Sequence, residues 1–216
     1  YPYVVKPRNS AGSKGLMYVF DDDSYQKAFK VYRHSSDYIV QDYISGTGVG
    51  YSIFANKGEI ISGHGHKRIA EFPISGGSSV YRENFEDVRL LSIAKKIISR
   101  VKWSGFAMLE FKLDRNNELH LIEINPRIWG SINQGLVNGI NYFSYILGRP
   151  HLKTQNILKY RTYLSPLIFL SFFSYLLKFQ FYPVRKFLKN FKYNRSDVSL
   201  FKDPGAWISL ILRAFK

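Results

Sequence analysis

Glu110 and the run Glu123-Ile124-Asn125-Pro126-Arg127 decide the fold of this sequence. Both lie in short apolar stretches typical of β-strands, residues 106–113 and 118–124. The cluster Asp114-Arg115-Asn116-Asn117 between these stretches consists of turn-forming residues. The sequence therefore predicts an antiparallel hairpin with acidic side chains on both strands.

The acidic side chains of this hairpin are candidate metal ligands. Because side chains alternate along a strand, Ile124 is expected on one face and its neighbours Glu123 and Asn125 on the other, where Glu110 can join them. Hard cations such as Mg2+, or Mn2+ in its place, bind carboxylate and amide oxygens and complete their shell with water and phosphate. Arg127 follows the strand and could clamp a phosphoryl group. The alternative is a set of polar residues on the solvent face of an ordinary hairpin.

The composition is that of a folded globular protein. Of the 216 residues, 45% are hydrophobic and 17% aromatic, which excludes wholesale disorder. There is no cysteine, so disulfides, thiolate metal sites and a cysteine nucleophile are excluded. This permits the cytoplasmic location that we expect, without proving it. An apolar stretch begins almost at once after Tyr1, which favours a fragment of a longer protein.

Residues 1–150 divide into two predicted lobes. Residues 1–45 are expected to form a strand, a small-residue loop, a strand, a helix capped by Ser24 and a further strand, which together make a small lobe. Residues 46–150 begin at a glycine-rich stretch typical of a hinge and predict a larger lobe that carries the metal site.

Residues 151–216 predict a basic, aromatic, helical tail. They carry 12 Lys and Arg against 2 Asp, a net charge of +10, whereas residues 1–150 carry 19 against 14 Asp and Glu, a net charge of +5. The uncharged stretch from Tyr163 to Leu177 is shorter than the roughly 20 apolar residues of a membrane span. We expect a helix docked on the protein. The alternative is peripheral contact with an anionic membrane, at its inner face.

The order and spacing of six stretches resemble the ATP-grasp superfamily, and within it the carbamoyl-phosphate-synthase-like ligases of carboxylates and amines. The resemblance covers about residues 1–148. It implies an α+β ATP-grasp fold with the nucleotide between two lobes, and an amino-terminal substrate-orienting domain outside this sequence. The six stretches are Val4-Val5-Lys6-Pro7, the loop from Ser10 to Gly15, Gln41-Asp42-Tyr43-Ile44, His66-Lys67-Arg68, Phe72-Pro73-Ile74-Ser75-Gly76-Gly77, and Glu110 with Glu123 to Arg127.

The resemblance also implies roles for individual residues. Lys6 would contact the ATP phosphates and the adenine edge, and Tyr43 and Ile122 would form apolar walls around the adenine. Lys67 and Arg127 would be catalytic, with Lys67 near the terminal phosphate. For Lys6 and Lys67 the alternative is a solvated surface lysine. The phosphate-covering loop and the adenine-binding strand would supply the other nucleotide contacts, which are Ser10, Gly12, Ser13, Lys14, Gly15, Gln41, Asp42 and Ile44.

The activity implied by the resemblance is an ATP- and Mg2+-dependent ligation of small molecules. The terminal phosphate of ATP would pass to a substrate carboxylate, and an amine or similar nucleophile would attack the acyl phosphate. Two departures from the family pattern limit this carry-over. Thr47 stands where many members have an acid that binds the ribose, which argues against the usual ribose recognition. Ser131 stands where carboxylating members have a glutamate, which argues against carboxylation.

Two other classes of function compete with the ligase. One is an ATP-binding protein that has lost catalysis, and the other is a binding module whose basic tail grips nucleic acid or a membrane surface. No recognisable RNA- or DNA-binding motif accompanies the charge, which argues against a nucleic-acid partner.

Polar residues outside the hairpin leave further alternatives open. Tyr81-Arg82-Glu83 and residues 129–133 border the predicted site and could hold an acceptor, but Arg82 and Glu83 could equally form a surface ion pair. His64 and His66 alternate along a strand. With no third ligand nearby, we expect them to be ordinary polar residues rather than a metal site.

Overall fold

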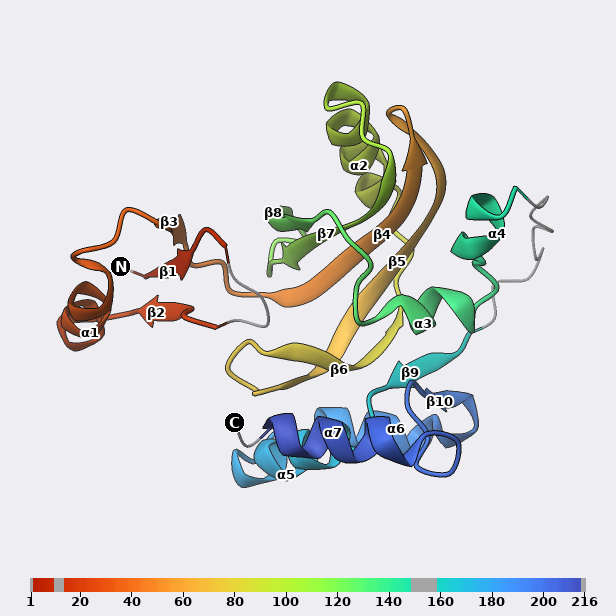
Figure 1. The fold of residues 1–216 in the computed structure, drawn as a ribbon. Coiled ribbons are helices and arrows are strands. Elements are labelled where there is room, and N and C mark those ends of the chain that lie inside the picture. Colours follow the sequence, from red (N-terminus) through yellow and green to blue (C-terminus); the bar gives the residue numbers. More distant parts are fainter. Residues whose placement is uncertain (1, 10–13, 149–158, 215–216) are drawn as a thin grey trace.

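The computed structural model describes residues 2–9, 14–148 and 159–214, which form two lobes with a helical layer beside the larger one (Figure 1). The small lobe contains a three-stranded antiparallel sheet in the order β2-β1-β3 and one helix. Its elements are β1 (Tyr3–Pro7), β2 (Met17–Val19), α1 (Asp22–Tyr32) and β3 (Tyr38–Asp42). This is the strand and helix order predicted from the sequence.

Helix α1 begins three residues earlier than the predicted Ser24 cap implies. Asp21, not Ser24, is the N-cap, and its carboxylate accepts a hydrogen bond from the Ser24 backbone N–H at 2.8 Å. Ser24 occupies the N3 position and its hydroxyl accepts from the Asp21 backbone N–H at 3.0 Å. This reciprocal capping box satisfies two amides that the first turn leaves without helical partners.

The large lobe contains a seven-stranded sheet in the order β10-β9-β6-β5-β4-β7-β8. All pairings are antiparallel except the parallel pair of β9 and β10. The five strands that precede the tail are β4 (Thr47–Asn56), β5 (Glu59–Phe72), β6 (Ser78–Asn84), β7 (Gly105–Leu113) and β8 (Leu119–Asn125). The predicted hairpin of the acidic side chains is therefore β7 and β8.

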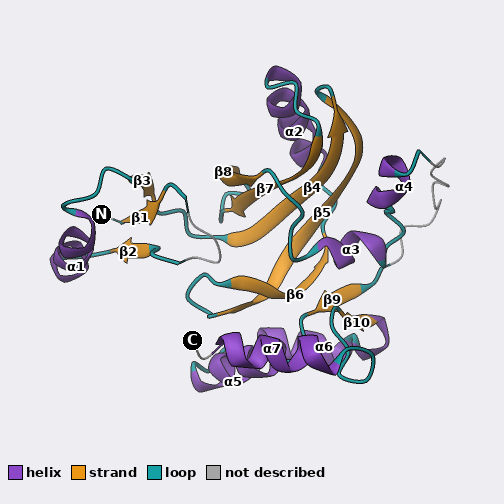
Figure 2. Ribbon diagram, viewed as in Figure 1, coloured by secondary structure: helices purple, strands orange, loops and turns teal. Residues whose placement is uncertain are grey.

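Helices cover both faces of the large sheet (Figure 2). Helix α2 (Val88–Arg100) packs Leu90, Ala94 and Ile98 on one face, against residues such as Ile53 of β4. The short helices α3 (Ile132–Leu136) and α4 (Tyr142–Ile146) follow the β8 strand and lie with the other face, where Met108, Trp129 and Tyr142 form a separate apolar cluster.

The tail is not purely helical, because two of its segments extend the large sheet. Strand β9 (Arg161–Tyr163) pairs with β6, and β10 (Asn194–Ser196) pairs with β9. The remaining elements are helices α5 (Leu167–Leu177), α6 (Tyr182–Lys189) and α7 (Pro204–Ala214), with a 3-10 turn η1 at Phe191–Tyr193.

The tail helices dock on the large lobe, as the sequence analysis expected for the apolar segment. Ile168 of α5 and Phe187 of α6 are buried against Ile69 of β5 and Tyr81 of β6. Among the described residues, no helix combines the length and the apolar composition that crossing a bilayer requires.

Candidate nucleotide and metal site

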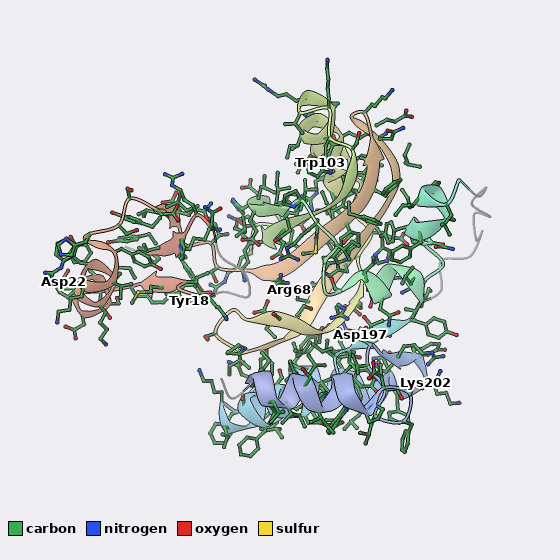
Figure 3. The ribbon with its side chains drawn as sticks, in the orientation of Figure 1. Tyr18, Asp22, Arg68, Trp103, Asp197 and Lys202 are labelled. Carbon is green, nitrogen blue, oxygen red and sulfur yellow. The ribbon has the colours of Figure 1, made fainter. Side chains whose placement is uncertain are left out.

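A cleft of about 320 Å³ lies where the small lobe faces the large sheet. Figure 3 shows Tyr18 in the small lobe and Arg68 in the large sheet, and both side chains line this cleft. Six residues predicted to form the site also line it: Lys6, Glu110, Ile122, Glu123, Asn125 and Arg127.

The strand register brings the three candidate metal ligands onto one face. Glu110 pairs directly with Glu123, and Met108, two residues earlier, pairs with Asn125. The Asn125 side-chain amide donates to the Glu123 carboxylate at 2.7 Å and lies 3.4 Å from a Glu110 carboxylate oxygen. Ile124 pairs with Leu109, whose side chain is buried in the α2 core, so it points to the opposite face.

This donor set fits a hard divalent cation. It consists of two carboxylates and one amide oxygen, which are the ligand types that Mg2+ prefers. Burial raises the pKa of the Glu110 carboxyl above its ordinary value, although the Arg68 guanidinium opposes the shift. A divalent cation beside Glu110 would add to the stabilisation that the Arg68 guanidinium already gives the ionised carboxylate.

Arg68 is the site residue that the sequence analysis did not single out. Its Nη2 lies 2.5 Å from the Glu110 carboxylate, and its Nη1 lies 3.2 Å from the Glu71 carboxylate. Arg68 stands on β5 and reaches Glu110 on β7 by crossing β4 at Gly48, where a Cβ atom would lie 2.7 Å from the Arg68 Cδ. A glycine inside a strand often marks such a close approach. Gly48 is therefore the feature of the sequence from which the role of Arg68 could have been suspected.

Gly50 makes the same kind of room for His66, because a Cβ atom there would lie 2.3 Å from the His66 ring. We expect Gly50→Ala to lower the free energy of unfolding by about 1–3 kcal/mol, since the buried ring has to shift in a packed layer. Urea denaturation measures this. Gly130→Ala is the matched control, because a Cβ atom there meets nothing within 4 Å. Equal stability of the two variants would contradict the packing argument.

Lys67 does not reach the metal-ligand set. It pairs with Val49, while the adjacent Gly50 pairs with Glu110, so Lys67 and Glu110 lie on opposite faces of the sheet. Its ammonium group lies 5.8 Å from the centre of the Phe85 ring. The structure therefore does not bring Lys67 together with the metal-ligand set, and Arg68, the next residue, provides a positive charge on the cleft side.

Lys6 connects the two lobes across the cleft. Its ammonium group donates to the Ile122 carbonyl at 3.3 Å and lies 3.6 Å from the Glu123 carboxylate. The Gln41 side chain donates to the same carbonyl at 3.4 Å. The β7–β8 register shifts beside Ile122, since Phe111 pairs with Leu121, and this bulge leaves the Ile122 carbonyl free for the small lobe.

The other predicted nucleotide contacts either do not line the cleft or fall outside the described residues. The Tyr43 ring stacks edge-on against Tyr18 and Phe20, and Asp42 is exposed. The Gly15 carbonyl accepts a hydrogen bond from the Tyr32 hydroxyl, which holds the end of the loop predicted to cover the phosphates against α1. Lys14 is exposed and Ile44 is half-buried, whereas Ser10, Gly12 and Ser13 fall outside the described residues.

Arg82 and Glu83 do not form an ion pair with each other. Arg82 pairs across the strands with Arg68, and Glu83 with Lys67, so their side chains lie on opposite faces. Arg82 is buried and forms an ion pair with Asp197 of the tail. Glu83 binds two tail cations, Arg161 at 3.1 Å and Lys186.

The two histidines of β5 are buried polar residues. His64 lies 3.0 Å from the Asn84 side chain, and burial lowers the pKa of His64 to about 4. Burial also lowers the pKa of His66 well below its ordinary value. Both imidazoles are therefore neutral near pH 7. Within the described part of the chain, neither belongs to the group of possible metal ligands, which is Asp114, Glu118 and His120.

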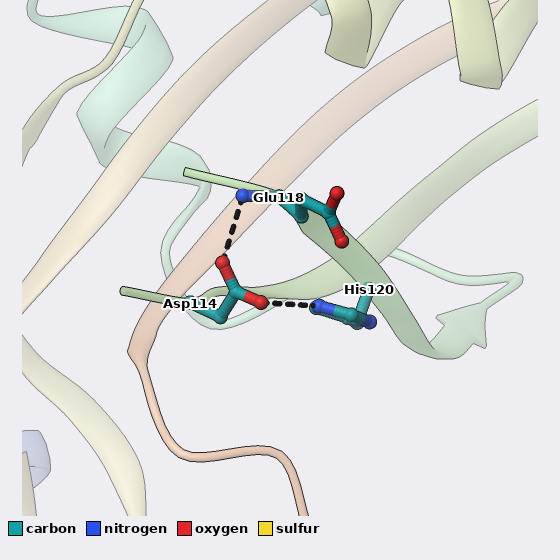
Figure 4. A group of neighbouring side chains, drawn as sticks. All are labelled: Asp114, Glu118 and His120. Atoms are coloured by element: carbon teal, nitrogen blue, oxygen red, sulfur yellow. Dashed lines mark hydrogen bonds and ion pairs between the residues drawn. The ribbon is translucent and has the colours of Figure 1, made fainter. Parts of the chain in front are cut away.

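Asp114, Glu118 and His120 gather at the turn of the β7–β8 hairpin (Figure 4). The Asp114 carboxylate accepts from the Glu118 backbone N–H at 2.8 Å and lies 2.9 Å from the His120 ring nitrogen. These hydrogen bonds lower the pKa of Asp114. The Asp114 carboxylate thus joins residues on both sides of the predicted turn.

Comparisons with known proteins place the chain in a family. A family model described as an ATP-grasp domain matches residues 1–131. A D-alanine–D-alanine ligase from Rickettsia bellii (strain RML369-C) is 26% identical over 137 residues, which cover 57% of this chain and 42% of the ligase. The chain therefore spans less than half the length of this relative.

Solved structures show the same fold at low sequence identity. The N5-carboxyaminoimidazole synthetase from Staphylococcus aureus, complexed with ADP, superposes with a TM-score of 0.55 at 17% identity, covering 69% of this chain and 42% of the synthetase. A biotin carboxylase from Campylobacter jejuni gives a TM-score of 0.54 at 17% identity, covering 68% and 36%. Since the family model matches more than half of its residues, the chain belongs to the ATP-grasp family.

Proposed function

We propose that this chain binds ATP and Mg2+ between its two lobes and forms the phosphoryl-transfer site of a ligase that joins a carboxylate to an amine. The convergence of Glu110, Glu123 and Asn125 on the cleft face of one hairpin carries the proposal. These three residues would hold the cation, which would neutralise charge on the ATP phosphates.

The cationic side chains of the cleft suit phosphoryl transfer, which depends on positioning and charge neutralisation rather than on a protein nucleophile. The Lys6 side chain reaches from the small lobe to Ile122 and Glu123 of the large lobe, and it would bind phosphate in the cleft. The Arg127 guanidinium donates to the Asn125 side-chain oxygen at 3.1 Å, which holds it beside the metal-ligand set. Arg68 provides a third positive charge.

Two bond exchanges make up the proposed reaction. A carboxylate oxygen of the first substrate bonds to the terminal phosphorus of ATP while the bond to the bridging oxygen breaks, and ADP leaves. The amine nitrogen of the second substrate then bonds to the acyl carbon while the bond to phosphate breaks, and the nitrogen releases a proton. The D-alanine–D-alanine ligase among the relatives supports this class of reaction.

ADP release by the intact protein tests the proposal, with Mg2+ and a panel of carboxylate and amine pairs. We expect Glu123→Gln to lower the rate at least about 100-fold, because it removes a charge aimed at the metal and phosphates. Glu118→Gln is the matched control, since Glu118 is exposed at the turn of the same hairpin. Nucleotide binding by the wild type that does not depend on Mg2+ would contradict the proposal, and Mg2+-dependent binding without turnover would identify the degenerate alternative.

A further inference from the structure

Helix α5 has apolar side chains on all sides, but the protein covers only one of them. Ile168 and Ser171 are fully buried, and the Ser171 hydroxyl donates to the Glu71 carbonyl of β5 at 2.7 Å. Phe169, Phe173 and Leu177 follow one another at four-residue spacing and are 57%, 63% and 65% exposed. Their spacing defines a continuous stripe on the outward side of the helix.

The turn after α5 and helix α6 add further exposed apolar side chains, together with exposed cations. Phe179, in the turn after α5, is 83% exposed. Helix α6 buries Phe187 and exposes the opposite side, where Leu188 is 66% exposed between the exposed cations Arg185 and Lys189. We refer to the α5 stripe, Phe179 and these three α6 residues as the outer tail surface.

Acidic side chains do not balance this charge. Of the two aspartates in residues 151–216, Asp197 is engaged with the buried Arg82, and Asp203 caps the start of α7 by accepting from the Ala206 N–H at 2.9 Å. Within the described ranges, several exposed tail cations form no ion pair: Lys178, Arg185, Lys189, Lys192 and Lys202.

We propose that the outer tail surface binds an anionic membrane surface peripherally. Exposed aromatic and aliphatic side chains with Lys and Arg nearby in the chain are typical of segments that lie in the headgroup region, where the apolar groups enter the lipid and the cations meet anionic headgroups. Nucleic acid would satisfy the cations but leave Phe169, Phe173 and Leu177 in water. The inference is independent of the proposed ligase activity, because no residue of this surface lines the cleft.

Co-sedimentation of the protein with lipid vesicles tests this. We expect binding to vesicles of phosphatidylcholine mixed with phosphatidylglycerol, little binding to phosphatidylcholine alone, and weakening by salt. Arg185→Glu combined with Lys189→Glu should lower the partition coefficient at least about tenfold. Phe173→Ser combined with Leu177→Ser should have an effect of similar size, since both side chains lose their apolar burial in the lipid.

Matched controls alter the same chemistry away from this surface. Lys27→Glu with Lys30→Glu reverses two exposed charges on α1, and Val88→Ser removes an apolar side chain that is 85% exposed at the start of α2. Neither should change vesicle binding. Equal binding to neutral and anionic vesicles would overturn the proposal. A second contradicting outcome is a dimer, detected by sedimentation velocity, that dissociates in the Phe173→Ser and Leu177→Ser variant, with no binding to vesicles. A third is binding to nucleic acid without binding to vesicles.

Discussion

Replacing Arg127 by lysine should lower the rate of ADP formation by about 10²–10³ while ATP affinity stays within about tenfold. The Arg127 guanidinium is held by the Asn125 side-chain oxygen at 3.1 Å and donates to the Ile128 carbonyl at 3.1 Å. A lysine ammonium is a point charge on a flexible stem and cannot reproduce this planar, two-sided arrangement. The charge that builds up in phosphoryl transfer would therefore lose a fixed partner.

Steady-state kinetics and equilibrium ATP binding, measured side by side, separate the two effects. Arg115→Lys is the matched control, because Arg115 is exposed in the turn of the same hairpin and should tolerate the change. An Arg127→Lys protein with an unchanged rate would contradict the role proposed for Arg127.

Removing the Asp197 carboxylate should destabilise the protein by about 3–5 kcal/mol. Its ion-pair partner Arg82 is 1% exposed, and the Asp197 side chain is 7% exposed. The other carboxylate oxygen accepts from the Asn133 side chain of α3 at 3.0 Å. Asp197→Ala would leave a buried guanidinium without a counter-charge, and this is a larger penalty than the loss of the pair itself. Urea denaturation gives the change in the free energy of unfolding.

Two further variants show whether the uncompensated charge is the cause. Asp203→Ala removes an exposed tail aspartate and should cost only about 1 kcal/mol, the usual value of a helix cap. Arg82→Met combined with Asp197→Leu replaces both charges by apolar groups and should recover most of the lost stability. If Asp197→Ala were no less stable than Asp203→Ala, the buried pair would not hold the tail to the sheet.

The convergence of the hairpin ligands could be predicted from local sequence, whereas the α+β ATP-grasp fold was implied by the family resemblance of six stretches spread over residues 1–148. The turn cluster from Asp114 to Asn117 fixes the β7–β8 hairpin, and alternation along two adjacent strands then places Glu110, Glu123 and Asn125 on one face. Both rules depend on residues close together in the chain. The ligand geometry of the hairpin therefore needed no information about the rest of the molecule.

The choice between Lys67 and Arg68 could not be predicted in this way. Which of two consecutive residues faces the cleft depends on the register of β5 against β4 and of β4 against β7, and a slip of one residue exchanges the faces. The small side chain of Gly48 then lets Arg68 cross to Glu110. The sequence shows this glycine, but not which side chain uses the space.

By itself, the sequence determined the two lobes, the acidic hairpin and the basic character of the tail, because strand alternation, turn chemistry and charge are local properties. Only the tertiary structure decided that β9 and β10 of the tail extend the large sheet, that Arg68 joins the cleft, and that Arg82 is neutralised by Asp197, 115 positions away in the chain. Those outcomes depend on contacts between distant segments, whose pairing is set by packing of the whole chain rather than by any single stretch.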